Sequence, residues 1–316
     1  RVAVIMAGGR GALLWPAGGE LKPKQFLALV DERTLLQATS ERIAPLIPQT
    51  RQFVVAGHDQ QALVRADLPG LDERLILEPE GRNTAPCIGL SAVHVLAADP
   101  QAVVAVLPAD HWVTDEVGFC AVLDRAFELA QVPGRIVTVG ITPTRAHTGF
   151  GYLQLSGPAD PAGVPLNRFV EKPDGASAAR MVGDGEHLWN GGIFVALAQT
   201  LLDEIERQLP ATGDALAAIA QSLGSEAYAS TLEARYRACD RISIDHGVME
   251  AARDVWCVPA DVGWSDVGNW DALGHARGGD KAGNSVVGSA TLIDTTNCVV
   301  DAADGITVSA IGIDGL

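Results

Sequence analysis

Short, almost continuously apolar stretches alternate along this chain with longer stretches in which apolar residues recur every three or four positions. The short stretches lie at residues 2–7, 53–56, 103–107, 136–139, 169–170 and 193–195. The longer ones, at residues 34–43, 85–98 and 117–130, have helical length and helical spacing. Strands that are continuously apolar and separated by helices indicate a mostly parallel sheet covered on both faces. We therefore predict a doubly wound α/β domain.

The pattern changes after about residue 284, where only short β-type pieces follow one another. They lie at residues 285–287, 291–293, 298–300 and 306–308, with Asp-Gly turns at 304–305 and 314–315. We predict a large domain at residues 1–283 and the start of a small, solenoid-like β domain at 284–316, which we expect to be incomplete. Such a β domain is a candidate dimerisation element, so a homodimer is one assembly open to the chain.

The charge, the apolar runs and the cysteines of the chain argue against several classes of protein. The chain has 316 residues, of which 47% are hydrophobic, and a formal net charge of -16. This charge repels polyanions, so we expect no binding to nucleic acid or to an anionic membrane surface. Its apolar runs are shorter than the roughly 20 residues that cross a bilayer. Its five cysteines are scattered without a Cys-x-x-Cys pair, which argues against disulfides and structural zinc and favours the cytoplasm.

The first apolar strand runs into the glycine-rich segment 8–11, and Lys22 and Lys24 follow it. Glycines allow backbone N–H groups to approach phosphate oxygens. The chain contains four lysines against 19 arginines, and two of the four lie here. Walker A is excluded because no Gly-Lys-Ser/Thr follows, and the dinucleotide fingerprint is excluded because Leu14 occupies the place of its third glycine. The segment predicts a phosphate-binding loop; a plain turn with solvated lysines is the alternative.

Two separated carboxylates are candidates for a metal pair. Asp110 follows the apolar strand 103–107, and Asp266 lies in a loop rich in tryptophan and glycine. Mg²⁺ is usually held by one or two carboxylates together with phosphates and water. We predict that Asp110 and Asp266 bind Mg²⁺ or another divalent cation. Taken singly, Asp110 could cap a helix and Asp266 could close a turn.

Polar residues in two further motifs are candidates for contacts with a ligand. Glu171 and Lys172 end the strand 169–170 before Pro173, and a solvated ion pair is their alternative interpretation. Asn190 precedes two glycines, and its amide can donate and accept hydrogen bonds to sugar hydroxyls, although a plain turn is equally simple.

A further motif precedes the helix predicted at residues 85–98. Asn83 or Thr84 could cap this helix, and capping is favoured for Thr84. Arg82 at the start of the helix would instead favour an anion.

With these motifs in order, the chain resembles bacterial mannose-1-phosphate guanylyltransferases, a branch of the sugar-1-phosphate nucleotidylyltransferases. The resemblance extends through nearly the whole chain. Its motifs are Ala7-Gly8-Gly9-Arg10-Gly11, Leu14-Trp15-Pro16, Lys22-Pro23-Lys24-Gln25-Phe26-Leu27, Glu78-Pro79, Arg82-Asn83-Thr84-Ala85-Pro86, Leu107-Pro108-Ala109-Asp110-His111, Thr148-Gly149-Phe150-Gly151-Tyr152, Phe169-Val170-Glu171-Lys172-Pro173, Trp189-Asn190-Gly191-Gly192-Ile193-Phe194, Ser243-Ile244-Asp245, Val248-Met249-Glu250 and Trp264-Ser265-Asp266-Val267-Gly268-Asn269-Trp270.

The resemblance implies a Rossmann-like enzyme that makes GDP-mannose and pyrophosphate from GTP and mannose 1-phosphate, with Mg²⁺ between Asp110 and Asp266. Lys24, Asp110 and Asp266 are the implied catalytic residues. The implied nucleotide-binding residues are Ala7, Gly8, Gly9, Arg10, Gly11, Lys24, Asn83, Thr84 and Asp110. The implied sugar-phosphate-binding residues are Gly151, Glu171, Lys172 and Asn190.

One departure from the family pattern concerns the phosphate loop. The family normally continues its loop with Thr or Glu and then an arginine, where this chain has Ala12 and Leu13. We expect Leu13 to weaken turnover unless Arg10 or a metal ion compensates. Two rivals stay open: a related enzyme acting on glucose 1-phosphate with UTP or dTTP, and a nucleotide-sugar binding protein without catalysis.

Overall fold

The computed structural model describes residues 1–9, 14–19 and 21–316. Arg10 and Gly11, predicted in the phosphate loop, and Leu13 lie outside the described residues. The chain divides into two compact units, which we treat separately. The sheet unit comprises Arg1–Gly8, Ser40–Ala109 and Asp115–Val262, and the small unit comprises Gly9–Thr39, Asp110–Thr114 and Gly263–Leu316. The predicted domain boundary at residues 283–284 stays a prediction.

The described part of the sheet unit is built on a nine-stranded sheet with the order β3-β2-β1-β4-β9-β6-β10-β8-β7. Neighbours are parallel from β3 to β4 and between β6 and β10, whereas β9, β7 and β8 pair antiparallel with their neighbours. The strands are β1 (Val2–Met6), β2 (Gln52–Gly57), β3 (Leu75–Glu78), β4 (Val103–Pro108), β6 (Arg135–Ile141), β7 (Tyr152–Leu155), β8 (Val164–Val170), β9 (His187–Leu197) and β10 (Asp254–Ala260).

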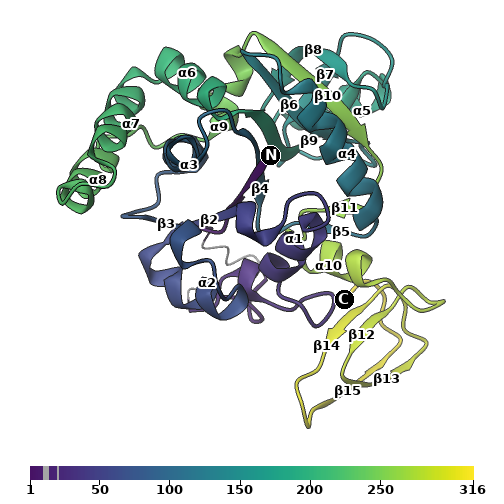
Figure 1. Ribbon diagram of the computed structural model, residues 1–316. Helices are drawn as coiled ribbons and strands as arrows, with labels where there is room; N and C mark the ends of the chain where they lie inside the picture. Colours follow the sequence, from purple (N-terminus) through teal and green to yellow (C-terminus); the bar gives the residue numbers. More distant parts are fainter. Residues whose placement is uncertain (10–13, 20) are drawn as a thin grey trace. The chain divides into compact units, whose positions relative to one another are not determined.

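Helices cover this sheet and bury its alternate apolar residues. Val2 and Val4 of β1 are buried in one hydrophobic cluster with residues of α3, α6 and α7. In Figure 1, α3 lies beside α6 and α7, and α8 follows α7. Helix α4 packs against β4, β6 and β10. The helices are α2 (Gln61–Asp67), α3 (Thr84–Ala98), α4 (Glu116–Leu129), α5 (Gly175–Gly183), α6 (Ala198–Gln208), α7 (Pro210–Ser222), α8 (Tyr228–Tyr236) and α9 (Ile244–Gly247), and α1 (Leu35–Ile43) contains the junction between Thr39 and Ser40.

The small unit has its own core and several short strands. Leu14, Leu27, Leu29, Trp112 and Leu273 are among the residues that form this core. Strand β5 (Trp112–Val113) pairs antiparallel with β11 (Trp264–Ser265), and α10 (Trp270–Arg277) follows. Near the C-terminus β12 (Ser285–Val287) pairs in parallel with β14 (Val299–Asp301), and β13 (Ser289–Ile293) with β15 (Thr307–Ile311).

The α/β class and the C-terminal β region are confirmed, and the sheet is mixed rather than mostly parallel. Local apolar periodicity located β2, β4, β6, α3 and α4 within one or two residues of their observed bounds. It could not reveal the antiparallel insertion of β9 between β4 and β6, because β9 is buried on both faces and, at residues 193–195, is as continuously apolar as the parallel strands. Within the described residues no helix is both long enough and apolar enough to span a membrane.

Candidate functional site

The two predicted metal ligands belong to the same unit, and a short antiparallel ribbon brings their segments together. Asp110 precedes β5 by two residues, and Asp266 follows β11 by one residue. Because Trp112 pairs with Ser265 in an antiparallel register, the start of β5 and the end of β11 lie at the same end of the ribbon. Asp110 and Asp266 therefore both emerge from that end, although 155 residues separate them in the sequence.

Lys24 links these two aspartates directly. Lys24 begins a short 3-10 turn (Lys24–Phe26). The residue before it, Pro23, is extended, and its ring fixes its own φ at -60°. The Lys24 side chain is buried, and its Nζ donates hydrogen bonds to Oδ2 of Asp110, at 2.8 Å, and to the backbone carbonyl oxygen of Asp266. The residue predicted to be catalytic thus contacts the carboxylate of one predicted metal ligand and the backbone of the other.

The surroundings of Asp110 favour its ionised form. Burial by itself would raise the pKa of the Asp110 carboxyl, but the nearby Lys24 ammonium, the electrostatic effect of His111 and the hydrogen bond from Lys24 outweigh burial and lower the pKa below its ordinary value. An ionised carboxylate is the form that coordinates a hard divalent cation.

The donor set fits Mg²⁺ completed by a substrate. In the described part of the chain, no group of three or more His, Cys, Asp or Glu side chains could hold a metal ion. Carboxylates are donors of the kind that Mg²⁺ takes together with phosphates and water; here Asp110 Oδ2 accepts from Lys24, and Asp266 Oδ1 accepts from the Gly268 N–H at 3.3 Å. The ammonium of Lys24 also marks this position as one suited to a cation.

The phosphate loop is described at its beginning. The Ala7 N–H donates to the Val55 carbonyl at 2.8 Å, which extends the pairing of β1 with β2. Gln25 Nε2 donates to the Gly9 carbonyl at 2.8 Å, within the small unit. At Gly8 an added Cβ would lie 2.8 Å from Oε2 of Glu78, so glycine leaves space for that buried carboxyl.

The sequence interpretation did not single out Glu78 as a buried acid. It lies at the end of β3, and Tyr236 of α8 donates a hydrogen bond to its Oε1. Burial raises the pKa of Glu78, against the effect of the Tyr236 hydrogen bond. In the sequence, Glu78 appears within the Glu78-Pro79 motif of the family resemblance and ends an otherwise apolar strand.

The four predicted sugar-phosphate residues are gathered in the sheet unit. Gly151 precedes β7, Glu171 follows β8 and Asn190 lies in β9, and β7 pairs with both other strands. The Asn190 N–H donates to the Gly151 carbonyl at 2.8 Å. An added Cβ at Gly151 would lie 2.6 Å from Glu171 Oε2. Gly151 therefore makes room for the Glu171 carboxylate, which explains why this position is a glycine.

Glu171 and Lys172 combine a buried anion with an exposed cation. The Glu171 side chain is 6% exposed, the Lys172 side chain is 58% exposed, and Lys172 Nζ lies 2.8 Å from Glu171 Oε1. Lys172 has a φ of 45°, a left-handed conformation that non-glycine residues rarely adopt, and Pro173 follows it. Such backbone strain concentrates at functional sites, and it holds an exposed ammonium above a buried carboxylate.

The Asn190 amide is oriented from two sides, and one of its partners was not predicted as a site residue. Its Oδ1 lies 3.0 Å from Thr138 Oγ1 and accepts from Gly192 N–H at 3.2 Å. Its Nδ2 donates to Oδ1 of Asp245, in α9, at 2.9 Å. This arrangement leaves the second N–H of the Asn190 amide as the group available to a ligand.

Asp245 itself is a perturbed acid beside the sugar-phosphate residues. Burial, followed by repulsion from Glu171, raises the pKa of Asp245 to about 6, while Lys172 and Asn190 act in the opposite direction. In the sequence, Asp245 appeared only within the Ser243-Ile244-Asp245 motif, where Ser243 caps α9 by accepting a hydrogen bond from the His246 N–H.

The predicted helix cap falls one residue earlier than favoured. Asn83, and not Thr84, is the N-cap of α3, and its Oδ1 accepts from the Thr84 N–H at 2.8 Å. Thr84 Oγ1 instead accepts from the Ile244 N–H at 2.8 Å, which ties α3 to α9. The prediction of Thr84 as the cap was wrong because a side chain near a helix start can also serve a distant segment.

In each unit, a residue beside a predicted site residue has a strained backbone. Asn83 adopts φ 68° and ψ -173°, a region essentially restricted to glycine. Val267, directly after Asp266, has a φ of 45°, although a β-branched residue is especially disfavoured there. Val267 is fully buried in the core of the small unit, and this packing holds the strained turn in place.

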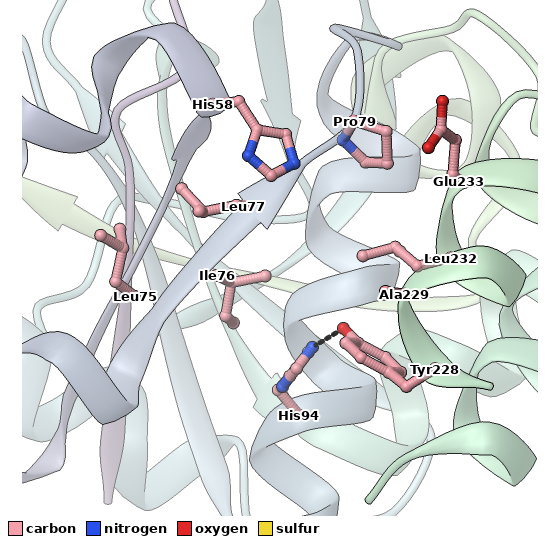
Figure 2. A pocket seen from close by; sticks show the side chains of 10 residues that line it. All are labelled: His58, Leu75, Ile76, Leu77, Pro79, His94, Tyr228, Ala229, Leu232 and Glu233. Atoms are coloured by element: carbon pink, nitrogen blue, oxygen red, sulfur yellow. Dashed lines mark hydrogen bonds between the residues drawn. The ribbon is translucent and has the colours of Figure 1, made fainter. Parts of the chain in front are cut away.

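A separate cavity lies in the sheet unit between β3, α3 and α8. It has a volume of about 460 Å³, and Figure 2 shows His94 of α3 facing Tyr228 of α8 across it. His94 Nε2 and the Tyr228 hydroxyl are hydrogen-bonded at 2.7 Å, and burial lowers the pKa of His94. None of the predicted site residues lines this cavity; its lining is His58, Leu75, Ile76, Leu77, Pro79, His94, Tyr228, Ala229, Leu232 and Glu233.

Comparison with known proteins shows which family this chain resembles in sequence and structure. The nucleotidyl transferase family matches residues 2–282. Mannose-1-phosphate guanylyltransferase 2 of Escherichia coli O157:H7 is 36% identical over 100% of this chain, which spans 67% of that protein. A crystal structure from Thermus thermophilus, described as a mannose-1-phosphate geranyltransferase, is 39% identical with a TM-score of 0.89, and the similarity covers 100% of this chain and 90% of the other.

A second solved structure is more distant. It is described as a mannose-6-phosphate isomerase from Helicobacter pylori and is 26% identical, with a TM-score of 0.69. The similarity covers 84% of this chain and 99% of the other.

Proposed function

Because the chain belongs to the nucleotidyl transferase family, and within it to the mannose-1-phosphate guanylyltransferases, we propose that it transfers GMP from GTP to mannose 1-phosphate and releases pyrophosphate. The observation that carries this proposal is the contact of Lys24 with both Asp110 and Asp266. A lysine and two acidic residues from three distant segments form a site for a cation and a polyphosphate, and a structural role alone does not require this arrangement.

The chemistry needs positioning and charge stabilisation more than proton transfer. A phosphate oxygen of mannose 1-phosphate attacks the α-phosphorus of GTP in line, and the bond from this phosphorus to the pyrophosphate oxygen breaks. The nucleophile is already an anion, so no general base is required. Asp110 and Asp266 would hold a divalent cation, and such an ion would neutralise charge on the phosphates.

Different residues of this chain bind the two substrates. The backbone N–H groups of the glycine loop and Lys24 hold the triphosphate. In the sheet unit, Lys172 provides positive charge for the sugar phosphate, and Asn190 offers one N–H for a hydrogen bond. Glu171 accepts hydrogen bonds from sugar hydroxyls, for which its buried carboxylate is preorganised by Gly151.

The test is pyrophosphate release measured with GTP, mannose 1-phosphate and increasing Mg²⁺. We expect turnover in the parent protein and loss of the metal response in Asp110→Ala and in Asp266→Ala. Asp271→Ala, which removes an exposed carboxylate from the same segment as Asp266, is the matched control and should behave like the parent. Full activity in both site variants would contradict the assignment of the metal ligands.

The same assay separates the proposal from its rivals. A panel of GTP, UTP and dTTP with mannose 1-phosphate and glucose 1-phosphate identifies a change of substrate. Calorimetry addresses the binding protein: association with GDP-mannose without any pyrophosphate release, at every Mg²⁺ concentration, would favour that alternative over the enzyme.

We further propose a cytoplasmic enzyme, because its substrates are nucleotides and all five cysteines are free thiols. A homodimer through the β region at residues 284–316 is proposed from the exposed apolar side chains of Ile293, Ile306 and Ile311. Sedimentation of the chain and of the variant Ile293→Asp checks the dimer: a monomer in both samples contradicts it.

A further inference from the structure

The Lys24 ammonium occupies the position that a divalent cation needs. Lys24 is 6% exposed, and its Nζ lies 2.8 Å from Oδ2 of Asp110, one of the two proposed metal ligands. A second hydrogen bond, to the Asp266 carbonyl oxygen, fixes the ammonium between the segments of both ligands. A buried ammonium is stable only when anions or carbonyl dipoles surround it, so these two contacts account for its burial.

A lysine at this position and a divalent cation on the same oxygen exclude each other. Mg²⁺ binds carboxylate oxygens at about 2.0–2.1 Å, which would bring it close to an ammonium that is hydrogen-bonded to that oxygen. Two positive charges in a partly buried site repel strongly. For the metal to bind Asp110, the ammonium must move to another anion, and the flexible stem of lysine permits such a movement.

We propose that Lys24 is a placeholder cation, which neutralises Asp110 in the free protein and moves to the triphosphate when the nucleotide and the metal enter together. This inference rests on the proposed function. The triphosphate provides the anion that Lys24 needs after it leaves Asp110. Binding of metal and of nucleotide is therefore coupled, and metal without nucleotide binds weakly because it must displace the buried ammonium from Asp110.

The matched pair of variants is Lys24→Gln and Lys22→Gln. The neutral amide of the Lys24→Gln variant cannot neutralise Asp110, whereas Lys22 lies two residues earlier, is exposed, and serves as the control for a lost lysine charge on the same segment. Mn²⁺ alone is the probe, and electron paramagnetic resonance counts free and bound ions without any enzymatic turnover. We expect Lys24→Gln to bind Mn²⁺ at least about tenfold more tightly than the parent and Lys22→Gln to match the parent.

Unchanged or weaker Mn²⁺ binding by folded Lys24→Gln would overturn the inference. This experiment needs no GTP, so its outcome is independent of whether the substrates of the proposed function are correct. Conversely, a tighter Mn²⁺ site in a protein that releases no pyrophosphate would reject the proposed function and keep the placeholder.

A measurement on the unmodified chain covers the case in which Lys24→Gln does not fold. The chain has four lysines, so ¹³C labelling of lysine side chains yields few NMR signals, and the buried Lys24 is recognised by its protection from acylation. We expect its signal to stay unchanged with Mg²⁺ at low concentration and to shift when GTP is added with Mg²⁺. A Lys24 signal unchanged by bound GTP and Mg²⁺ would show that the ammonium does not leave Asp110.

Discussion

Replacing Gly151 by alanine tests whether the space beside Glu171 matters for the sugar-phosphate residues. The new Cβ would lie 2.6 Å from Glu171 Oε2, whereas ordinary contacts begin at 3.4 Å, so the carboxylate must move by about 0.8 Å. Asn190 Cβ and Phe169 Cζ, both at 3.3 Å, restrict any movement of the alanine itself. Because the Glu171 carboxylate is 6% exposed, its displacement disturbs the ion pair with Lys172.

We expect this displacement to lower the free energy of unfolding by about 1–2 kcal/mol, the range for a charge-assisted hydrogen bond with one exposed partner. A comparable loss in substrate binding raises the KM for mannose 1-phosphate about tenfold, since ~1.4 kcal/mol corresponds to one order of magnitude. Urea denaturation and initial rates at varied mannose 1-phosphate measure the two effects. The control is Gly157→Ala, in the loop after β7, where an added Cβ meets no atom within 4 Å. Equal KM and equal stability in the two variants would refute the argument.

Three further predictions concern the strained backbone at Asn83, the titration of Asp245 and the presence of Leu13 where the family has an arginine. Glycine at position 83 adopts the observed φ and ψ without strain and costs little as a helix cap, whereas alanine keeps the strain and loses the cap. We therefore expect the Asn83→Gly variant to be more stable than Asn83→Ala by about 1–3 kcal/mol, measured by urea denaturation. The reverse order of stability would contradict the backbone strain. The pKa of Asp245 is about 6 in the folded protein against an ordinary value of 3.8, so the folded state holds the proton more tightly. The free energy of unfolding should therefore fall by up to roughly 3 kcal/mol as pH rises from about 4 to 6, and the Asp245→Asn variant should lack this fall. Parallel curves of stability against pH for the two proteins would contradict this prediction. Finally, the Leu13→Arg variant should raise kcat for pyrophosphate release on the order of 10³-fold, by analogy with an arginine finger. An unchanged kcat would show that the replacement of the expected arginine by Leu13 does not limit turnover.

The residues of the candidate site were largely visible in the sequence, because each follows a strongly apolar strand or lies in a glycine-rich turn. Asp110 and Glu171 were found in this way, from the rule that ligands gather at strand ends. Asp245, the hydrogen-bond partner of Asn190, was not predicted by this rule. Asp245 lies in a short helix outside the sheet, and its contact with Asn190 joins residues 55 positions apart.

The sequence by itself determined the local elements and the kinds of side chain available for chemistry, because apolar spacing and turn residues act over a few positions. Tertiary structure decided which of these side chains meet. The contact between Lys24 and the Asp266 carbonyl spans 242 residues, and it exists because β5 pairs with β11 around the core of the small unit. Such pairing depends on the burial of the whole unit, and no local pattern around Lys24 encodes it. The strained turn at Val267 has the same origin, since only packing from all sides can hold a β-branched residue at a φ of 45°.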